Sequence, residues 1–131
     1  MKNKYLMLML MFAVSSVNAQ VYDFNNITLL SNWFNPTEPT ATAYNIKYNG
    51  IWGWSDGNGS EYAIVGAASG TYFIDVTNPA TPIQRDYVAG RRNNCIWREI
   101  KTYQNYCYMV SDDQAPNSLQ IVDLSYLPDS V

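Results

Sequence analysis

Short runs of β-forming residues set the architecture of this chain. Seven such runs, rich in β-branched and aromatic residues, are separated by Gly, Pro, Asn and Asp. The runs cover residues 46–54, 61–66, 71–76, 83–88, 96–103, 106–111 and 118–124. No window of about eleven residues carries the apolar spacing of an amphipathic helix. The sequence therefore predicts an all-β fold, preceded by an irregular segment at residues 20–43 that is laid over a sheet.

The seven runs repeat. Pairs of matching segments are offset by 48 or 49 residues: 51–54 with 100–103, 74–76 with 122–124, and 78–79 with 127–128. This period lies in the range of four-stranded β-propeller blades. We therefore expect residues 44–90 to form a first propeller repeat and residues 91–131 a second one, truncated before its fourth strand.

The strands are apolar on both sides. Within one run, Tyr62 and Ile64 alternate with Ala63 and Val65, so both faces of the predicted sheet need cover. Stacked blades supply cover on both sides. Because closed propellers use about 4–8 blades, we expect a fragment of a larger propeller whose other blades come from a missing C-terminal part. A small carbohydrate-binding β-sandwich remains the alternative.

The first 19 residues read as a signal peptide. Lys2 and Lys4 precede an apolar run over residues 5–14, and a tail of small residues ends at Ala19. The apolar run is shorter than the ~20 residues that a membrane-spanning helix needs. We expect cleavage after Ala19 and secretion of the mature chain.

Composition excludes several classes of function. The chain has no histidine, which excludes His-dependent nucleophile triads and His-ligated zinc sites within it. After the leader, six basic and eleven acidic residues leave a net charge of −5. Because nucleic-acid binders neutralise phosphates with Lys and Arg, we expect no nucleic-acid partner. We predict no metal, cofactor or membrane span.

The two cysteines enter an oxidising compartment if the chain is secreted. A hairpin turn at Gln104-Asn105 places Cys107 opposite Thr102, which leaves Cys95 too distant along the strand for a disulfide within this hairpin. A bridge through a neighbouring strand stays open. We favour Cys107 as a small buried apolar residue.

The motifs resemble those of a known family. The segments 48–54, 61–66 and 70–79, continued by 97–103 and 119–125, are similar to LVIVD-repeat proteins and more closely to the choice-of-anchor B family. The resemblance covers residues 44–128. It implies a secreted bacterial β-propeller held at the cell surface by a C-terminal anchor, with no defined catalytic activity.

Four residues are candidates for ligand binding. Trp52, Trp54 and Trp97 offer broad aromatic faces to a sugar ring or peptide side chain, and Arg98 could clamp a carboxylate. Because Trp52 and Trp54 alternate on one strand, they could instead pack against a neighbouring blade. We favour packing for the tryptophans but assign any binding role to this group.

The acidic residues favour structural roles. Asp75 and Asp123 share one repeat position, where we expect them to cap turns rather than to form a carboxylate ring around a channel. Asp56 begins a Gly-rich loop that resembles a turn more than a calcium site. Glu99 could form a glycosidase pair with Asp112 or Asp113 at a suitable separation.

These features favour a non-enzymatic binding or interaction scaffold at the bacterial surface, whose partner is an extracellular protein or glycan. One alternative is a propeller-type enzyme acting on extracellular polysaccharide. The other is the carbohydrate-binding sandwich.

Overall fold

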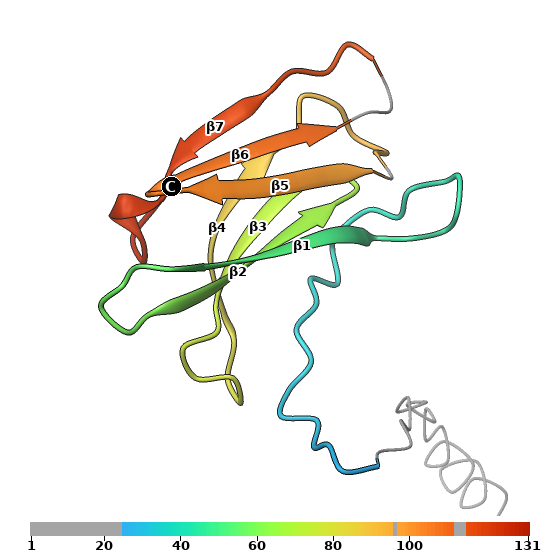
Figure 1. The fold of residues 1–131 in the computed structure, drawn as a ribbon. Helices are drawn as coiled ribbons and strands as arrows, with labels where there is room; N and C mark the ends of the chain where they lie inside the picture. The colour runs from blue at the N-terminus through green and yellow to red at the C-terminus, as the bar shows by residue number, and fades with distance from the viewer. Residues whose placement is uncertain (1–24, 96, 112–114) are drawn as a thin grey trace, which may run out of the picture.

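The computed structural model describes residues 25–95, 97–111 and 115–131. The predicted signal peptide lies outside the described residues. The fold is all-β, as predicted, with two antiparallel sheets and one short 3-10 helix, η1 (Figure 1). Each predicted run begins and ends within two residues of a strand.

Each sheet follows the order of the chain. The first sheet holds four strands: β1 (Tyr48–Ser55), β2 (Glu61–Ala67), β3 (Gly70–Asp75) and β4 (Ile83–Ala89). The second sheet holds three strands and is followed by the helix: β5 (Arg98–Tyr103), β6 (Tyr106–Ser111), β7 (Gln120–Asp123) and η1 (Leu124–Tyr126). Sequential antiparallel neighbours need only short loops, which the Gly- and Asn-rich connections supply.

Local chemistry explains two of the hairpins. In the β1–β2 loop, the Asp56 carboxylate accepts hydrogen bonds from the main-chain N–H groups of Asn58 (2.7 Å) and Ser60 (3.0 Å). Gly57 and Gly59 adopt φ angles of 76° and 107° in this loop, which favour glycine. The loop is therefore a turn closed by its own carboxylate.

The β5–β6 hairpin turns at Gln104, whose φ is 53°. This turn pairs Thr102 with Cys107, as the sequence predicts. Cys107 is a free thiol with no exposed surface, in agreement with its predicted role as a small apolar core residue. Cys95 is also buried, and its thiol donates to the main-chain oxygen of Arg92 at 3.5 Å.

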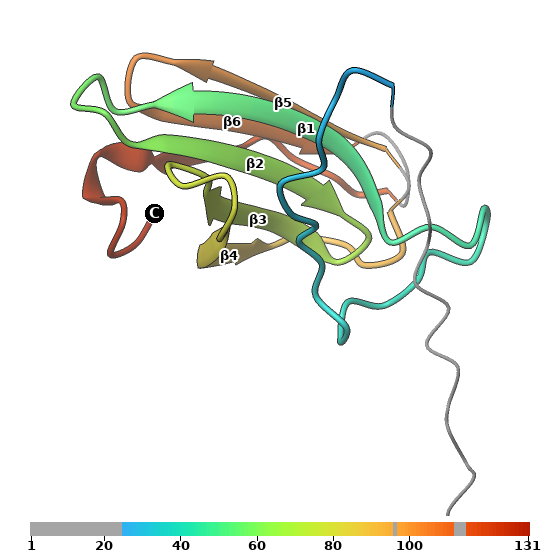
Figure 2. The same cartoon turned by 90° about the horizontal axis from the view of Figure 1, so that it is seen from below.

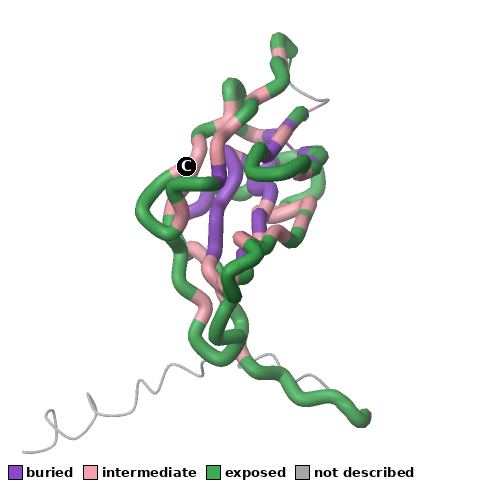
Figure 3. Tube along the Cα trace, turned by 60° about the vertical axis from the view of Figure 1, so that its left-hand side comes forward, coloured by how far each residue is buried: buried purple, intermediate pink, exposed green. Residues whose placement is uncertain are grey.

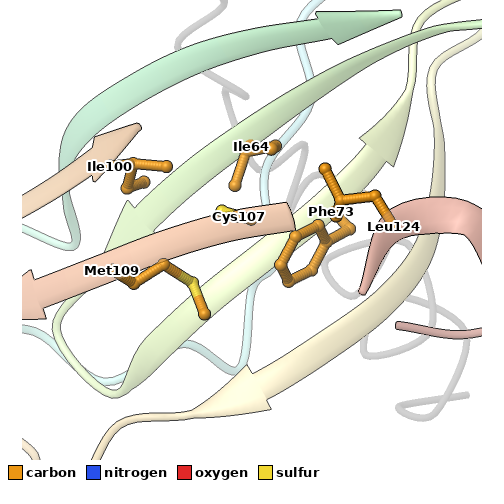
Figure 4. Packing of buried hydrophobic residues seen from close by; sticks show 6 residues of the cluster. All are labelled: Ile64, Phe73, Ile100, Cys107, Met109 and Leu124. Carbon is orange, nitrogen blue, oxygen red and sulfur yellow. The ribbon is translucent and has the colours of Figure 1, made fainter. Parts of the chain in front are cut away.

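The main core lies where the two sheets face each other (Figure 4). Its buried members come from both sheets and η1: Ile64, Phe73, Ile100, Cys107, Met109 and Leu124. Figure 2 shows the second sheet lying across β1 and β2 of the first. Figure 3 shows the buried residues gathered along the strands, while the loops are exposed. Because six buried side chains join the layers, the sheets form one unit.

The two sheets have equivalent registers. Trp54 pairs with Tyr62, which pairs with Asp75 in the first sheet. Tyr103 pairs with Tyr106, which pairs with Asp123 in the second. The first and third strands of the two sheets therefore correspond at the offsets expected from the sequence, 49 and 48 residues, whereas the second strands correspond at 44 because the β5–β6 turn is shorter than the β1–β2 loop.

Equivalent registers define two kinds of face. We call one the aromatic face, formed in the first sheet by Trp52, Trp54, Tyr62, Ile64 and Phe73, and in the second by Lys101, Tyr103, Tyr106, Tyr108 and Ile121. We call the other the aliphatic face, formed in the first sheet by Ile51, Gly53, Ala63, Val65 and Ile74, and in the second by Ile100, Thr102, Cys107, Met109 and Val122. The aromatic face of the first sheet packs on the aliphatic face of the second.

Residues 25–43 run along the aliphatic face of the first sheet without forming a strand. The Trp33 ring lies 5.8 Å from that of Tyr48 and 5.2 Å from that of Tyr72. The main-chain N–H of Asn35 donates to the Tyr48 hydroxyl at 2.7 Å. This segment thereby covers one end of the sheet.

The described strands form two open sheets rather than a closed ring. Among the residues that the structure describes, none forms a helix with the length and hydropathy to span a membrane.

Candidate functional site

The predicted ligand-binding residues lie in two places. Trp52 and Trp54, from β1, lie between the sheets. Trp97 and Arg98 lie at the beginning of β5, where the chain enters the second sheet. The sequence grouped these four residues, and the structure divides them into two pairs.

The β1 tryptophans join the two sheets. The indole N–H of Trp52 donates to the Thr102 hydroxyl at 2.9 Å, and the Lys101 ammonium lies 3.9 Å from the centre of the same ring. The indole N–H of Trp54 donates to the main-chain oxygen of Gln104 at 3.0 Å. Because both polar groups are used within the protein, packing describes these two residues better than ligand binding does.

Arg98 is directed into the protein. The residue as a whole is only 7% exposed. The guanidinium donates to the main-chain oxygens of Ala67 at 2.6 Å and Arg92 at 3.0 Å. These charge-assisted bonds tie the loop before β5 to the end of β2. Arg98 therefore holds two segments together, and it also lines the pocket beside Trp97.

Trp97 remains available to a ligand. It is 53% exposed and lines an open pocket of 490 Å³ at the beginning of β5. The pocket is also lined by Ile46, Asn49, Gly50, Arg98, Glu99 and Val110. The Tyr44 ring lies 6.3 Å from the Trp97 ring at an angle of 56°. This pocket combines an aromatic surface with polar groups.

Asn49 lines the pocket with its side-chain amide held in a fixed orientation. Its Oδ1 accepts from the main-chain N–H groups of Gly50 at 2.7 Å and Arg98 at 3.2 Å, which fixes the orientation of the amide. Its Nδ2 is buried and has no acceptor among the described residues. Because this atom is buried, it faces the protein interior, and the contribution of Asn49 to the pocket is its fixed position between Gly50 and Arg98.

Gly50 brings β1 and β5 close together beneath the pocket. A Cβ at Gly50 would lie 2.5 Å from the main-chain oxygen of Arg98, which is too close for any side chain. Glycine is therefore required for the approach of these strands, which positions Asn49 beside Trp97.

Glu99 supplies the pocket's carboxylate. It forms an ion pair of 2.7 Å with Lys101, and both side chains are exposed. The partners considered for a glycosidase pair, Asp112 and Asp113, lie outside the described residues. Glu99 can accept hydrogen bonds from a ligand in this position.

Asp75 and Asp123 occupy equivalent turns. The Asp75 carboxylate accepts from the main-chain N–H of Thr77 at 3.0 Å and pairs with Arg85 at 2.7 Å. The Asp123 carboxylate accepts from the main-chain N–H of Ser125 at 2.9 Å and from its hydroxyl at 2.5 Å. Hydrogen bonds from Thr77 and Ser125, respectively, lower the pKa of each carboxyl below its usual value. Both residues face their own turns.

The sequence analysis missed Glu38, which lies in the irregular segment. Glu38 is 3% exposed, and its carboxylate accepts from the main-chain N–H of Ser69 at 2.8 Å, the Ser69 hydroxyl at 2.7 Å and the Tyr72 hydroxyl at 2.6 Å. Burial, followed by the hydrogen bond to Glu38, raises the pKa of Tyr72. The network fastens the segment to β3. Glu38 stands alone in a stretch rich in Pro and Thr, and nothing in that pattern predicts that its carboxylate is buried.

Within the described parts of the chain, no three acidic or cysteine side chains gather as a metal site would need. Comparison of the chain with known protein families, with curated proteins and with solved structures finds no match.

Proposed function

We propose that this protein is a secreted, surface-associated binding scaffold of the LVIVD-repeat and choice-of-anchor B type. In this proposal the two sheets are consecutive blades of a larger propeller. The equivalent registers and the packing of unlike faces support the blade arrangement. The leader sequence supports secretion.

The proposed ligand is an extracellular glycan bound at the Trp97 pocket. The observation that carries this proposal is the half-exposed Trp97 ring beside the exposed Glu99 carboxylate in one open pocket. A sugar ring presents a C–H face that can stack on an indole, and its hydroxyl groups both donate and accept hydrogen bonds. Pockets of this kind combine apolar surface with a few fixed polar groups.

The test is a titration of the protein with neutral and acidic soluble oligosaccharides, followed by tryptophan fluorescence. Binding should be lost in Trp97→Ala and retained in Tyr126→Ala. Tyr126 is a suitable control because it is an exposed aromatic residue that does not line the pocket. Binding that is equal in both variants would place the ligand elsewhere.

The same samples decide between a scaffold and an enzyme. Chromatography of the oligosaccharides after incubation should show no cleavage products. Cleavage products that form with the unmodified protein but not with Glu99→Gln would show that the protein is a hydrolase and not a scaffold. Mass spectrometry of the secreted protein should also find Gln20 at its N-terminus.

A further inference from the structure

The contact between the two sheets leaves one face of each kind without a facing sheet. The aromatic face of the first sheet and the aliphatic face of the second meet in the core. The aromatic face of the second sheet therefore points outward at one end of the described fold. The aliphatic face of the first sheet points outward at the other, where Trp33 covers the part around Tyr48 and Tyr72 and leaves Ile51 exposed.

The outward aromatic face is rich in apolar surface. Tyr103 is 67% exposed, Ile121 is 55% exposed, and Tyr106 and Val110 are also exposed. In the first sheet, the equivalents of Tyr103 and Ile121 are Trp54 and Phe73, which pack against the second sheet. The same register positions are thus covered in one sheet and uncovered in the other.

The outward aliphatic face offers a matching surface. Ile51 is 72% exposed and lies beside Ala63, Val65 and Ile74 in an open apolar pocket of 290 Å³, bounded on one side by Trp33. A Cβ at Gly53 would meet no atom within 4 Å, so this part of β1 is open. In the second sheet, the residues at the equivalent positions are in the main core and pack against the first sheet.

We propose that a second copy of this chain docks on the outward aromatic face of the second sheet through its own outward aliphatic face. Over the part of β1 and β2 that Trp33 leaves open, the docked sheet would repeat the contact already present between the two sheets of one chain. This inference rests on the proposed stacking of blade-like sheets, and it adds the partner that continues the stack.

A second copy fits for two reasons. The complementary face is present on the same chain, in the register that the internal contact already uses. The two outward faces also differ, so the contact is head-to-tail and cannot be satisfied by one symmetric pair. Copies therefore add in sequence, and the rotation between them decides whether they form a closed ring or an open filament.

The test uses one charged variant on each face and measures association by sedimentation of the full chain. Ile121→Glu disables the aromatic face, and Ile51→Glu disables the aliphatic face. Both residues are exposed, so both variants should fold, with circular dichroism as the check; Tyr103→Glu is a second variant of the aromatic face. Ile27→Glu, another exposed isoleucine, is the matched control.

The unmodified chain and Ile27→Glu should associate with rising concentration, and each face variant alone should associate at least about tenfold more weakly. An equal mixture of Ile121→Glu and Ile51→Glu should form a dimer, because each supplies the face that the other lacks. A strictly monomeric unmodified chain, or a mixture that stays monomeric, would overturn the proposal.

Glycan binding by the Ile121→Glu monomer separates the two proposals. Binding retained without association supports a pocket that is independent of the stack. Association without glycan binding would leave the docking proposal standing and remove the proposed ligand.

Discussion

Removal of the Glu38 carboxylate should destabilise the fold although this residue lies in a segment without strands. Glu38→Ala leaves the main-chain N–H of Ser69 and the hydroxyl of Tyr72 without their acceptor. An unsatisfied buried donor costs about 1–3 kcal/mol. The hydroxyl groups can reorient in part, so we expect a loss of about 2–4 kcal/mol in the free energy of unfolding.

Urea unfolding followed by circular dichroism measures this loss, provided that the slope of the transition is unchanged. Glu61→Ala is the matched control, because Glu61 is an exposed acid on β2 and its removal should change stability by less than about 0.5 kcal/mol. Glu38→Gln keeps one acceptor oxygen, so its loss of stability should lie between those of Glu38→Ala and Glu61→Ala. Proteolysis within residues 25–43 should also become faster in Glu38→Ala.

A loss below about 0.5 kcal/mol in Glu38→Ala would refute this reasoning. It would mean that the segment is not fastened through its carboxylate. The same result would remove the explanation for the packing of the partly buried Trp33 against the first sheet.

Three further predictions follow from single contacts. Gly50→Ala should destabilise the protein by about 1–3 kcal/mol in urea unfolding, since its Cβ meets a main-chain oxygen, whereas Gly53→Ala should be neutral or slightly stabilising. Burial raises the pKa of the Cys107 thiol to about 12, so stability should fall as pH rises above ~9, and Cys107→Val should reduce that fall. The lowered pKa of Asp75 contributes stability that is present above pH ~4 and is lost as the pH falls further. In Asp75→Asn, the urea midpoint should therefore depend less on pH in the acid range.

The strands could be predicted because their determinants are local. Alternation between Tyr62 and Val65 and the turn residues after Ser55 each specify structure within a few positions. The offset between Ile51 and Ile100 also anticipated the equivalence of the two sheets. Hairpin pairing follows the chain order, so topology required little beyond these signals.

The site residues depend on partners that are distant in sequence. Trp52 bonds to Thr102, 50 positions away, and Arg98 bonds to Ala67, 31 positions away. The composition of the segment around Glu38 likewise gives no indication that Ser69 and Tyr72 meet it. Side-chain chemistry suggested candidates, but only the packing of the sheets determines which of them remain exposed.

The most direct test of the account concerns the contact between the two sheets. In a nuclear Overhauser spectrum of the full chain, the Trp52 indole proton should show contacts to the Thr102 side chain, and the Trp54 indole proton should show contacts to Gln104. These results would establish the packing of unlike faces from which the blade and docking proposals follow. A spectrum in which neither indole proton contacts β5 or the turn that follows it would contradict the account.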